Sequence, residues 1–196
     1  MHLLEKYALD TGVKIDKPYI YQHYFPLTNS KYIIFHSEGS GSKNFGHWQE
    51  VLNVLSPLLK EEGIEIFNIG KNEEGVPKRK YGGVIDVKNN TSIANVAYMI
   101  ENCELYLGVD CFSAQLAGMY DKNAVVLYSH VFKENRAPYF GDKTKQVLIE
   151  PNRQGKKPWF NQPDSEKDAD NFCPYEIANA VCSLLKIKYK YEFKSI

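Results

Sequence analysis

The sequence predicts a single α/β domain in which a mostly parallel sheet is flanked by helices. Two observations lead to this fold class. Short apolar runs alternate with amphipathic helical patterns from residue 31 onward, an arrangement typical of βαβ units and of a parallel sheet covered on both faces. The 196 residues, 43% of them apolar, match one ordinary globular domain with its own core. We therefore expect one domain over residues 31–196, preceded by a linker-like segment over residues 1–30.

The predicted strands are short and rich in apolar or β-branched residues, as buried strands of a parallel sheet are. They cover residues 32–35, 64–69, 83–87, 105–109, 124–128 and 146–149. Residues 1–30 differ from this pattern, because they contain a short helical start followed by an extended stretch rich in Pro and Tyr.

Helices are predicted where apolar residues recur at three- and four-residue steps. The first such face consists of Trp48, Val51, Leu52, Leu55, Leu58 and Leu59. Gly63 ends that helix, Thr91 or Ser92 caps the next, and a third covers residues 113–120. Pro174, at a first-turn position, opens the last helix after a long loop. The predicted order is β-α-β-β-α-β-α-β-β-α.

Charge and cysteine usage argue against several classes of function, although a local basic patch would still be able to bind nucleic acid or membrane. The chain has 24 basic and 24 acidic side chains, so no large positive field attracts it to nucleic acid or to an anionic membrane. The cysteines form no C-x-x-C pair and show no metal-ligand spacing with histidine, so no metal is expected; they are Cys103, Cys111, Cys173 and Cys182. No secretory signal or apolar run of 18 residues is present, and we expect a cytoplasmic protein.

Ligands of an open parallel sheet bind outside the carboxyl ends of its strands, near the topological switch point. This rule selects the loops 36–44, 70–74, 88–92 and 110–113, with 129–136 as a fifth candidate. Their residue types suit an anionic, nucleotide-like ligand.

The loop after the first strand reads HSEGSGSK and has the composition of a phosphate-binding turn. Gly39 and Gly41 allow backbone to approach a ligand closely. Ser40 and Ser42 add hydroxyl donors, and Lys43 supplies a positive charge at the entry to the next helix. The loop has neither the Walker A spacing nor the G-x-G-x-x-G spacing, so an ordinary turn is the alternative interpretation.

The turn after the strand 105–109 reads DCFS. Asp110 either caps the following helix or belongs to an anion site, and the two roles are compatible. In the anion site, the amides of Cys111, Phe112 and Ser113 point at a diphosphate and are helped by the helix dipole.

Two further sets of residues complete the predicted nucleotide site. Thr91 and Ser92 cap a helix, and from the same edge of the sheet they would also reach a nucleobase. Glu73 would accept hydrogen bonds from ribose hydroxyls; the alternative is a surface glutamate without a role.

Three segments together resemble glycosyltransferase family 9, the family of ADP-heptose:lipopolysaccharide heptosyltransferases. They are IIFHSEGSGSKNFGHW, IEIFNIGKNEE and NNTSIANVAYMIENCELYLGVDCFSAQLAGMYDKNAVVLYSHVFKENRAPYFG. The resemblance covers about residues 30–140, and the final helix from Pro174 fits the closing helix of the family. It implies a Rossmann-like domain similar to the carboxyl-terminal domain of a GT-B enzyme, which holds a nucleotide-diphosphate sugar as donor substrate and needs no cofactor.

The resemblance also implies roles for individual residues. Lys43 would meet the donor phosphates, with Gly39 and Ser40 in the preceding loop. Glu73 takes the place of the ribose-binding acid, and Thr91 falls where the base is contacted.

The segment from Asp110 to Ser113 departs from the family pattern. Family members usually read Asp-Thr/Ser-Gly followed by a histidine, whereas here Phe112 replaces the glycine and Gln115 stands at or near the histidine position. This difference implies a donor site that is altered relative to the usual family pattern.

The resemblance further implies a partner. Family members have an amino-terminal domain that binds the acceptor and supplies the catalytic base, and MHLLEKYALDTGV resembles the linker that leaves that domain. We expect a separate acceptor-binding chain or a self-associated copy. His36 and His130 lie at the predicted ligand edge, but a structural hydrogen bond is the more usual role of such a histidine, so no catalytic residue is assigned.

Three functions remain open from the sequence. The first is a metal-independent glycosyltransferase or its donor-binding part, since no D-x-D-type motif precedes a strand. The second is a nucleotide or nucleotide-sugar binding protein without catalysis. The third is an interaction module that binds nucleic acid or membrane through the tail KIKYKYEFKS, for which a solvated tail is the alternative.

Overall fold

The structure is a computed structural model of the 196-residue chain. The structure describes residues 1–27, 31–39, 45–71, 79–153, 155, 157–158 and 171–189. None of the helices in these ranges has the length and apolar character needed to cross a bilayer.

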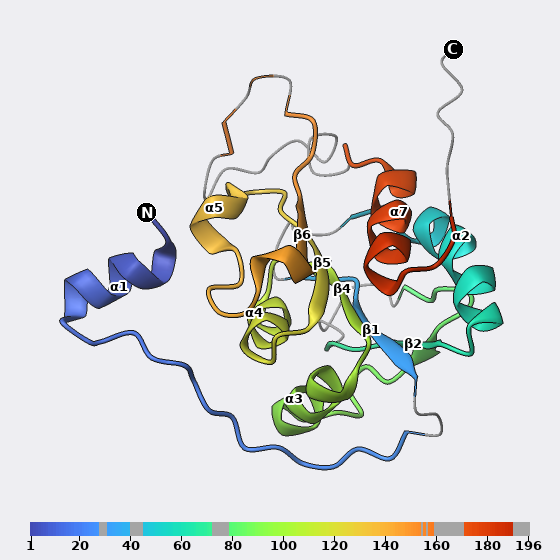
Figure 1. The fold of residues 1–196 in the computed structure, drawn as a ribbon, viewed down its shortest axis with the longest axis horizontal. Helices are drawn as coiled ribbons and strands as arrows, with labels where there is room; N and C mark the ends of the chain where they lie inside the picture. The colour runs from blue at the N-terminus through green and yellow to red at the C-terminus, as the bar shows by residue number, and fades with distance from the viewer. Residues whose placement is uncertain are drawn as a thin grey trace.

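A six-stranded, fully parallel sheet runs through the centre of the molecule in the order β3-β2-β1-β4-β5-β6 (Figure 1). Its strands are β1 (Tyr32–His36), β2 (Glu65–Asn68), β3 (Ile85–Asp86), β4 (Leu105–Val109), β5 (Asn123–Leu127) and β6 (Gln146–Ile149). The chain builds the sheet outward from β1 in one direction and from β4 in the other. The topological switch point therefore lies between these two strands, where a parallel sheet usually binds its ligand.

Helices cover both faces of the sheet (Figure 1). On one face lie α2 (Trp48–Glu61) and α7 (Pro174–Leu185), and on the other lie α3 (Ile93–Asn102) and α4 (Phe112–Met119). The short helices α1 (Leu3–Thr11) and α5 (Lys133–Arg136) and the 3-10 turn η1 (Lys143–Lys145) lie outside these layers.

The alternation of side chains along each strand divides the core in two. In β1, Ile33 and Phe35 pack with α2 and α7, whereas Tyr32 and Ile34 pack with α3 and α4. All five residues of β1 and of β4 are buried, as expected for central strands with helices on both faces. Trp48, at the start of α2, is fully buried, and its indole Nε1 donates a hydrogen bond to the Ser37 carbonyl at 2.9 Å.

The predicted fold class and element order are confirmed. Strands 105–109 and 146–149 have the predicted bounds, and Pro174 stands in the first turn of α7. Ser92, not Thr91, is the N-cap of α3: its hydroxyl accepts from the Asn95 amide at 3.1 Å, and Asn95 Oδ1 accepts from the Ser92 amide at 3.0 Å.

The differences from prediction involve short elements. The strand expected over 83–87 is only two residues long and lies at the edge of the sheet, where it pairs with β2. Helix α4 begins at Phe112, one residue earlier than predicted, and α5 and η1 were not predicted.

Residues 1–27 wrap around the α3 and α4 side of the domain (Figure 1). The His23 amide donates to the Ala94 carbonyl at 3.2 Å, and Gln22 Nε2 donates to the Tyr120 hydroxyl at 2.9 Å. At the other end of this segment, His2 Nε2 lies 2.9 Å from the Ala137 carbonyl oxygen. The segment thus crosses from α3 to the loop after α5. Its predicted role as a linker stays a prediction.

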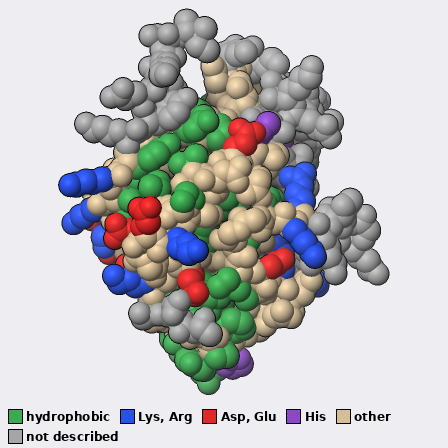
Figure 2. Space-filling model, turned by 90° about the vertical axis from the view of Figure 1, so that its right-hand side faces the viewer, with side chains coloured by type: hydrophobic (Ala, Val, Ile, Leu, Met, Phe, Trp, Pro, Cys, Tyr) green, Lys and Arg blue, Asp and Glu red, His purple; other side chains and the backbone are tan. Residues whose placement is uncertain are grey.

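Basic and acidic side chains are interspersed on the face of the molecule drawn in Figure 2. This distribution agrees with equal numbers of basic and acidic residues in the sequence. Hydrophobic side chains gather between the charged ones on the same face.

Candidate ligand-binding cleft

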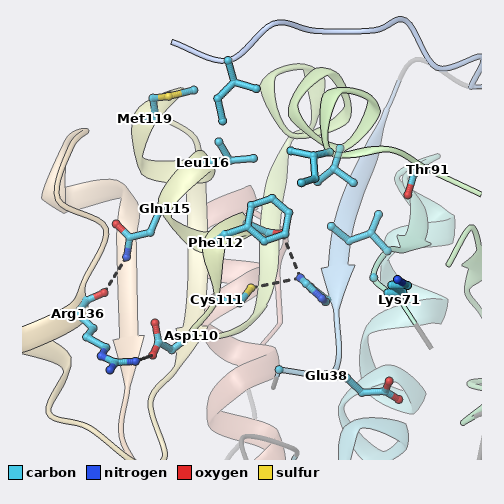
Figure 3. Close-up of a pocket in the computed structure, with 18 of the residues that line it drawn as sticks. Glu38, Lys71, Thr91, Asp110, Cys111, Phe112, Gln115, Leu116, Met119 and Arg136 are labelled. Atoms are coloured by element: carbon cyan, nitrogen blue, oxygen red, sulfur yellow. Dashed lines mark hydrogen bonds and ion pairs between the residues drawn. The ribbon is translucent and has the colours of Figure 1, made fainter. Parts of the chain in front are cut away.

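A cleft of about 1530 Å³ opens at the carboxyl edge of the sheet, at the switch point. Its walls come from the residues after β1, β2 and β4, from the first turns of α3 and α4, from the loop around α5 and from the N-terminal segment. Figure 3 shows eighteen of its lining residues. The position is the one that the sequence predicted from the parallel sheet.

Seven of the predicted site residues line this cleft: Gly39, Thr91, Ser92, Asp110, Cys111, Phe112 and Ser113. They come from three loops that are far apart in the sequence. The other five, Ser40, Gly41, Ser42, Lys43 and Glu73, lie outside the described residues. The binding role of all twelve stays a prediction.

The first turn of α4 opens into the cleft. Its N-cap residue is Cys111, whose side chain makes no capping hydrogen bond. Asp110 therefore does not occupy the N-cap position, contrary to one of its two predicted roles. The amides at the start of α4 lack intrahelical acceptors, so they and the helix dipole favour an anion there.

Three cationic side chains line the cleft and were absent from the predicted site: Lys71, Arg79 and Arg136. Arg136 lies in the fifth candidate loop. Its position beside Asp110 depends on the tertiary arrangement of α5 next to the turn after β4. Its Nη1 lies 3.6 Å from Asp110 Oδ2 (Figure 3). The sequence signal for Lys71 was its position in another candidate loop, residues 70–74.

A buried cation joins two of the loops behind the cleft. Lys88 Nζ lies 3.2 Å from Glu38 Oε1, in an ion pair whose angle is outside hydrogen-bond geometry, and the lysine side chain is only 3% exposed. Since Glu38 lines the cleft, this pair connects the loop after β1 to the loop before α3. Among the described residues that line the cleft, the two carboxylates, Glu38 and Asp110, thus lie beside a cation.

The cleft has a polar end and an apolar end (Figure 3). Glu38 and Asp110 mark the polar end, and Leu116 and Met119 mark the other. Apolar residues from α3, from the N-terminal segment and from the residue that follows β2 also line the cleft; they are Leu3, Leu4, Ile20, Ile69, Ile93 and Val96. Phe112 lies between the two ends and is 47% exposed, so its ring is available to a ligand.

Gln115 has a structural role in the cleft wall. Its Nε2 donates to the Arg136 carbonyl at 2.9 Å, and its Oε1 accepts from the Tyr139 amide at 3.3 Å. These bonds hold α4 against the loop around α5. They occupy both ends of the side-chain amide at the position where the resemblance implies a histidine.

Cys111 contacts a histidine at the bottom of the cleft. Its Sγ lies 3.2 Å from His36 Nδ1 and 3.3 Å from the Tyr106 hydroxyl. Burial alone would raise the pKa of the Cys111 thiol. The charge of His36, hydrogen bonds with His36 and Tyr106, and the Ala114 amide outweigh burial and lower this pKa to about 7. The cysteine was predicted to line the site, but its contact with His36 was not predicted.

Metal binding has no support in the described part of the chain. No group of three or more His, Cys, Asp or Glu side chains there is arranged to hold a metal ion.

No protein-family model and no curated protein matches the sequence. Several solved structures match its fold. ADP-heptose lipopolysaccharide heptosyltransferase II from E. coli has a TM-score of 0.60 at 13% identity, covering 82% of this chain and 48% of that chain. The iron-containing dodecameric glycosyltransferase TibC of enterotoxigenic E. coli has a TM-score of 0.61 at 12% identity, covering 84% and 49%. A family 9 glycosyltransferase from Veillonella parvula has a TM-score of 0.59 at 12% identity, covering 93% and 50%.

These neighbours agree with the resemblance to glycosyltransferase family 9 at the level of the fold. The chain spans about half the length of each of them. At such low identity, the likeness concerns the fold alone, and activity has to be argued from the cleft.

Proposed function

We propose that the cleft binds a nucleotide-diphosphate sugar and that the chain is the donor-binding part of a metal-independent glycosyltransferase of GT-B architecture. The observation that carries this proposal is the first turn of α4, which opens into a cleft lined by Lys71, Arg79 and Arg136 at the switch point. A fold similar to heptosyltransferases is the second support.

In this proposal, the diphosphate lies at the polar end of the cleft. The amides of Phe112 and Ser113 donate to its oxygens, and Arg136 and Lys71 balance its charge. Gly39, Ser40, Gly41, Ser42 and Lys43 would supply further amides, hydroxyls and a positive charge to the phosphates.

The nucleoside lies toward the apolar end. Phe112, Ile93 and Val96 offer flat or branched apolar surface to a base. Thr91 offers a hydroxyl to its edge, and Ser92, whose hydroxyl caps α3, lies beside Thr91. Glu73 would bind the ribose. An adenine nucleotide is the first ligand to test, because the neighbour WaaC is described with ADP and TibC with an ADP-heptose.

Transfer requires charge to develop on the diphosphate as the bond to the sugar breaks. Preoriented amides and cations stabilise that charge without reorganising, which is how such sites accelerate a reaction. The acceptor hydroxyl must be held in line with the donor carbon and must lose a proton. We propose that a separate acceptor-binding partner or a second copy of the chain supplies these functions, and that they operate in the cytoplasm.

The alternative is a nucleotide or nucleotide-sugar binding protein that catalyses no transfer. Gln115 favours this alternative function. Its side-chain amide is hydrogen-bonded to the backbone of Arg136 and Tyr139, and an amide does not act as an acid or a base. Binding and transfer therefore have to be measured separately.

A thermal-shift panel of ADP-, UDP-, GDP- and CMP-sugars tests the proposal, repeated on Lys43→Ala. We expect one nucleotide class to raise the melting temperature of the wild type and to raise that of Lys43→Ala less. If every ligand leaves the wild-type curve unmoved, donor binding is refuted. If a ligand binds but no sugar is released or transferred with any acceptor, the alternative function holds.

A further inference from the structure

Four side chains from three elements meet at the bottom of the cleft. His36 ends β1, Tyr106 lies in β4, and Cys111 and Ser113 belong to the start of α4. His36 Nδ1 lies 3.2 Å from Cys111 Sγ and 3.1 Å from Ser113 Oγ. Tyr106 Oη lies 3.3 Å from the same sulfur. The Cys111 thiol is partly exposed and lines the open cleft.

Two glycines allow backbone to pack closely against His36. His36 is paired with Gly108 of β4, where a Cβ would lie only 2.6 Å from the His36 carbonyl oxygen and 3.1 Å from its Cβ. On the other side, a Cβ at Gly70 would lie 3.1 Å from His36 Nε2. Backbone therefore packs closely against His36 on both sides, and a side chain at either glycine would crowd it.

We propose that Cys111 and His36 form a reactive thiolate–imidazolium pair, and that hydrogen peroxide entering the cleft oxidises this thiolate to a sulfenic acid. Reactive cysteines are partly exposed thiols that lie beside a cation or at a helix N-terminus. Cys111 has both features, because it lies beside His36 and at the N-terminus of α4. The inference does not depend on nucleotide binding.

The charges around the sulfur decide its ionisation. His36 faces it from β1, and the hydroxyls of Tyr106, in β4, and Tyr128, directly after β5, face it from the core. Asp110, the preceding residue, lies beside Arg136 of α5, which offsets the carboxylate. Burial raises the pKa of both tyrosines above the usual range, so they stay neutral and do not repel a thiolate.

The oxidation step needs only Cys111, His36 and hydrogen peroxide. The thiolate sulfur attacks one peroxide oxygen, so that an S–O bond forms and the O–O bond breaks. Sulfur is oxidised by two electrons and the peroxide is reduced. The departing hydroxide takes the proton of the His36 imidazolium and leaves as water, which gives a sulfenic acid and a neutral imidazole.

The other cysteines of the chain are internal controls. Cys103 and Cys182 are buried, and burial raises their pKa values to about 12 and about 11. Cys173 is the closest match to Cys111, because it is partly buried and is also a helix N-cap, that of α7. Within the described residues, no hydrogen bond joins Cys173 to a histidine.

The test measures sulfenic acid formation at each cysteine of the full chain by dimedone trapping and peptide mass spectrometry after brief exposure to peroxide. At pH 7 we expect Cys111 to react at least about tenfold faster than Cys173. The Cys111 rate should rise with pH and reach half of its maximum near pH 7. Equal rates at the two cysteines, or a midpoint at pH 8.5 or above, would overturn the proposal.

A variant isolates the contribution of the imidazole. His36→Asn keeps a hydrogen-bonding group but removes the positive charge, so the Cys111 midpoint should move upward and its rate at pH 7 should fall. Circular dichroism and an unchanged rate at Cys173 verify the fold. A folded His36→Asn protein with an unshifted midpoint would refute the pair. If this variant does not fold, the wild-type pH profile alone decides.

Discussion

Arg136 Nη1 lies 3.6 Å from Asp110 Oδ2, so the end of α5 meets the turn after β4 at the polar end of the cleft (Figure 3). The backbone of Arg136 is fixed to α4 as well, since its carbonyl accepts from Gln115 Nε2 at 2.9 Å. The guanidinium is thus held beside the site proposed for the diphosphate. This relationship joins three segments of the cleft wall.

We expect Arg136→Ala to weaken ADP binding by about tenfold, because it removes a charge-assisted contact to phosphate. It should also lower the free energy of unfolding by about 1–2 kcal/mol, since Asp110 is largely buried and loses a neighbouring cation. Titration calorimetry and urea unfolding measure the two effects. Lys145→Ala is the control, because its ion pair with Asp121 is exposed and neither residue lines the cleft. Equal ADP affinities of the two variants would contradict the role of Arg136.

Glu38→Gln should destabilise the protein by about 3 kcal/mol, because it leaves the charge of Lys88 without its carboxylate in a buried position. Lys6→Gln breaks an exposed pair with Asp10 and should change stability by less than about 0.5 kcal/mol. Chemical denaturation of both variants gives the comparison. If Glu38→Gln loses no more stability than Lys6→Gln, the ion pair between Glu38 and Lys88 does not stabilise the fold.

Gly108→Ala should cost about 1–3 kcal/mol of stability, because the new Cβ would lie 2.6 Å from the His36 carbonyl oxygen and 2.7 Å from Tyr106 Oη. The strain should also displace His36 from Cys111 and slow the reaction of that thiol. Gly82→Ala is the matched control, since its Cβ would meet only the Gln49 side chain, at 3.5 Å. Thermal unfolding that ranks the two variants equally would argue against close packing at Gly108.

The thiol of Cys111 makes stability depend on pH. Its pKa is lowered from 9.0 to about 7 in the folded chain, so its interactions favour folding above pH 9 and this contribution is lost as pH falls toward 7. The difference in unfolding free energy between wild type and Cys111→Ser should therefore grow from pH 6 to pH 9 under reducing conditions. Cys173→Ser serves as the reference. A difference for Cys111→Ser that stays constant over this range would contradict the lowered pKa.

Local sequence was sufficient for most of the fold. Strands β4 and β6 and the first turn of α7 match prediction, because apolar runs and a proline at a helix start act within a few residues. Elements without such signals were missed. Helix α5 reads KENR and has no buried residue, so no apolar period marks it.

The candidate site was predictable in place but not in its contacts. The parallel order of strands brought the loops after β1 and β4 to one edge, as expected. The pairs His36–Cys111 and Glu38–Lys88 join residues that are 50 or more positions apart in the sequence. Such pairing depends on strand register and on the small residues between strands, which periodicity does not encode. Similarly, the N-cap of α4 depends on where the strand ends, and it is Cys111 and not Asp110.

Titration calorimetry of the full chain with ADP, UDP, GDP and CDP is the most direct test of the proposed cleft. We expect one of these nucleotides to bind at a single site, and Lys71→Gln to weaken that binding severalfold through loss of a phosphate-facing charge. Lys60→Gln, on the exposed side of α2, should bind like the wild type. Absence of binding by all four nucleotides, or equal affinities for the two lysine variants, would contradict a diphosphate at the carboxyl edge of this sheet.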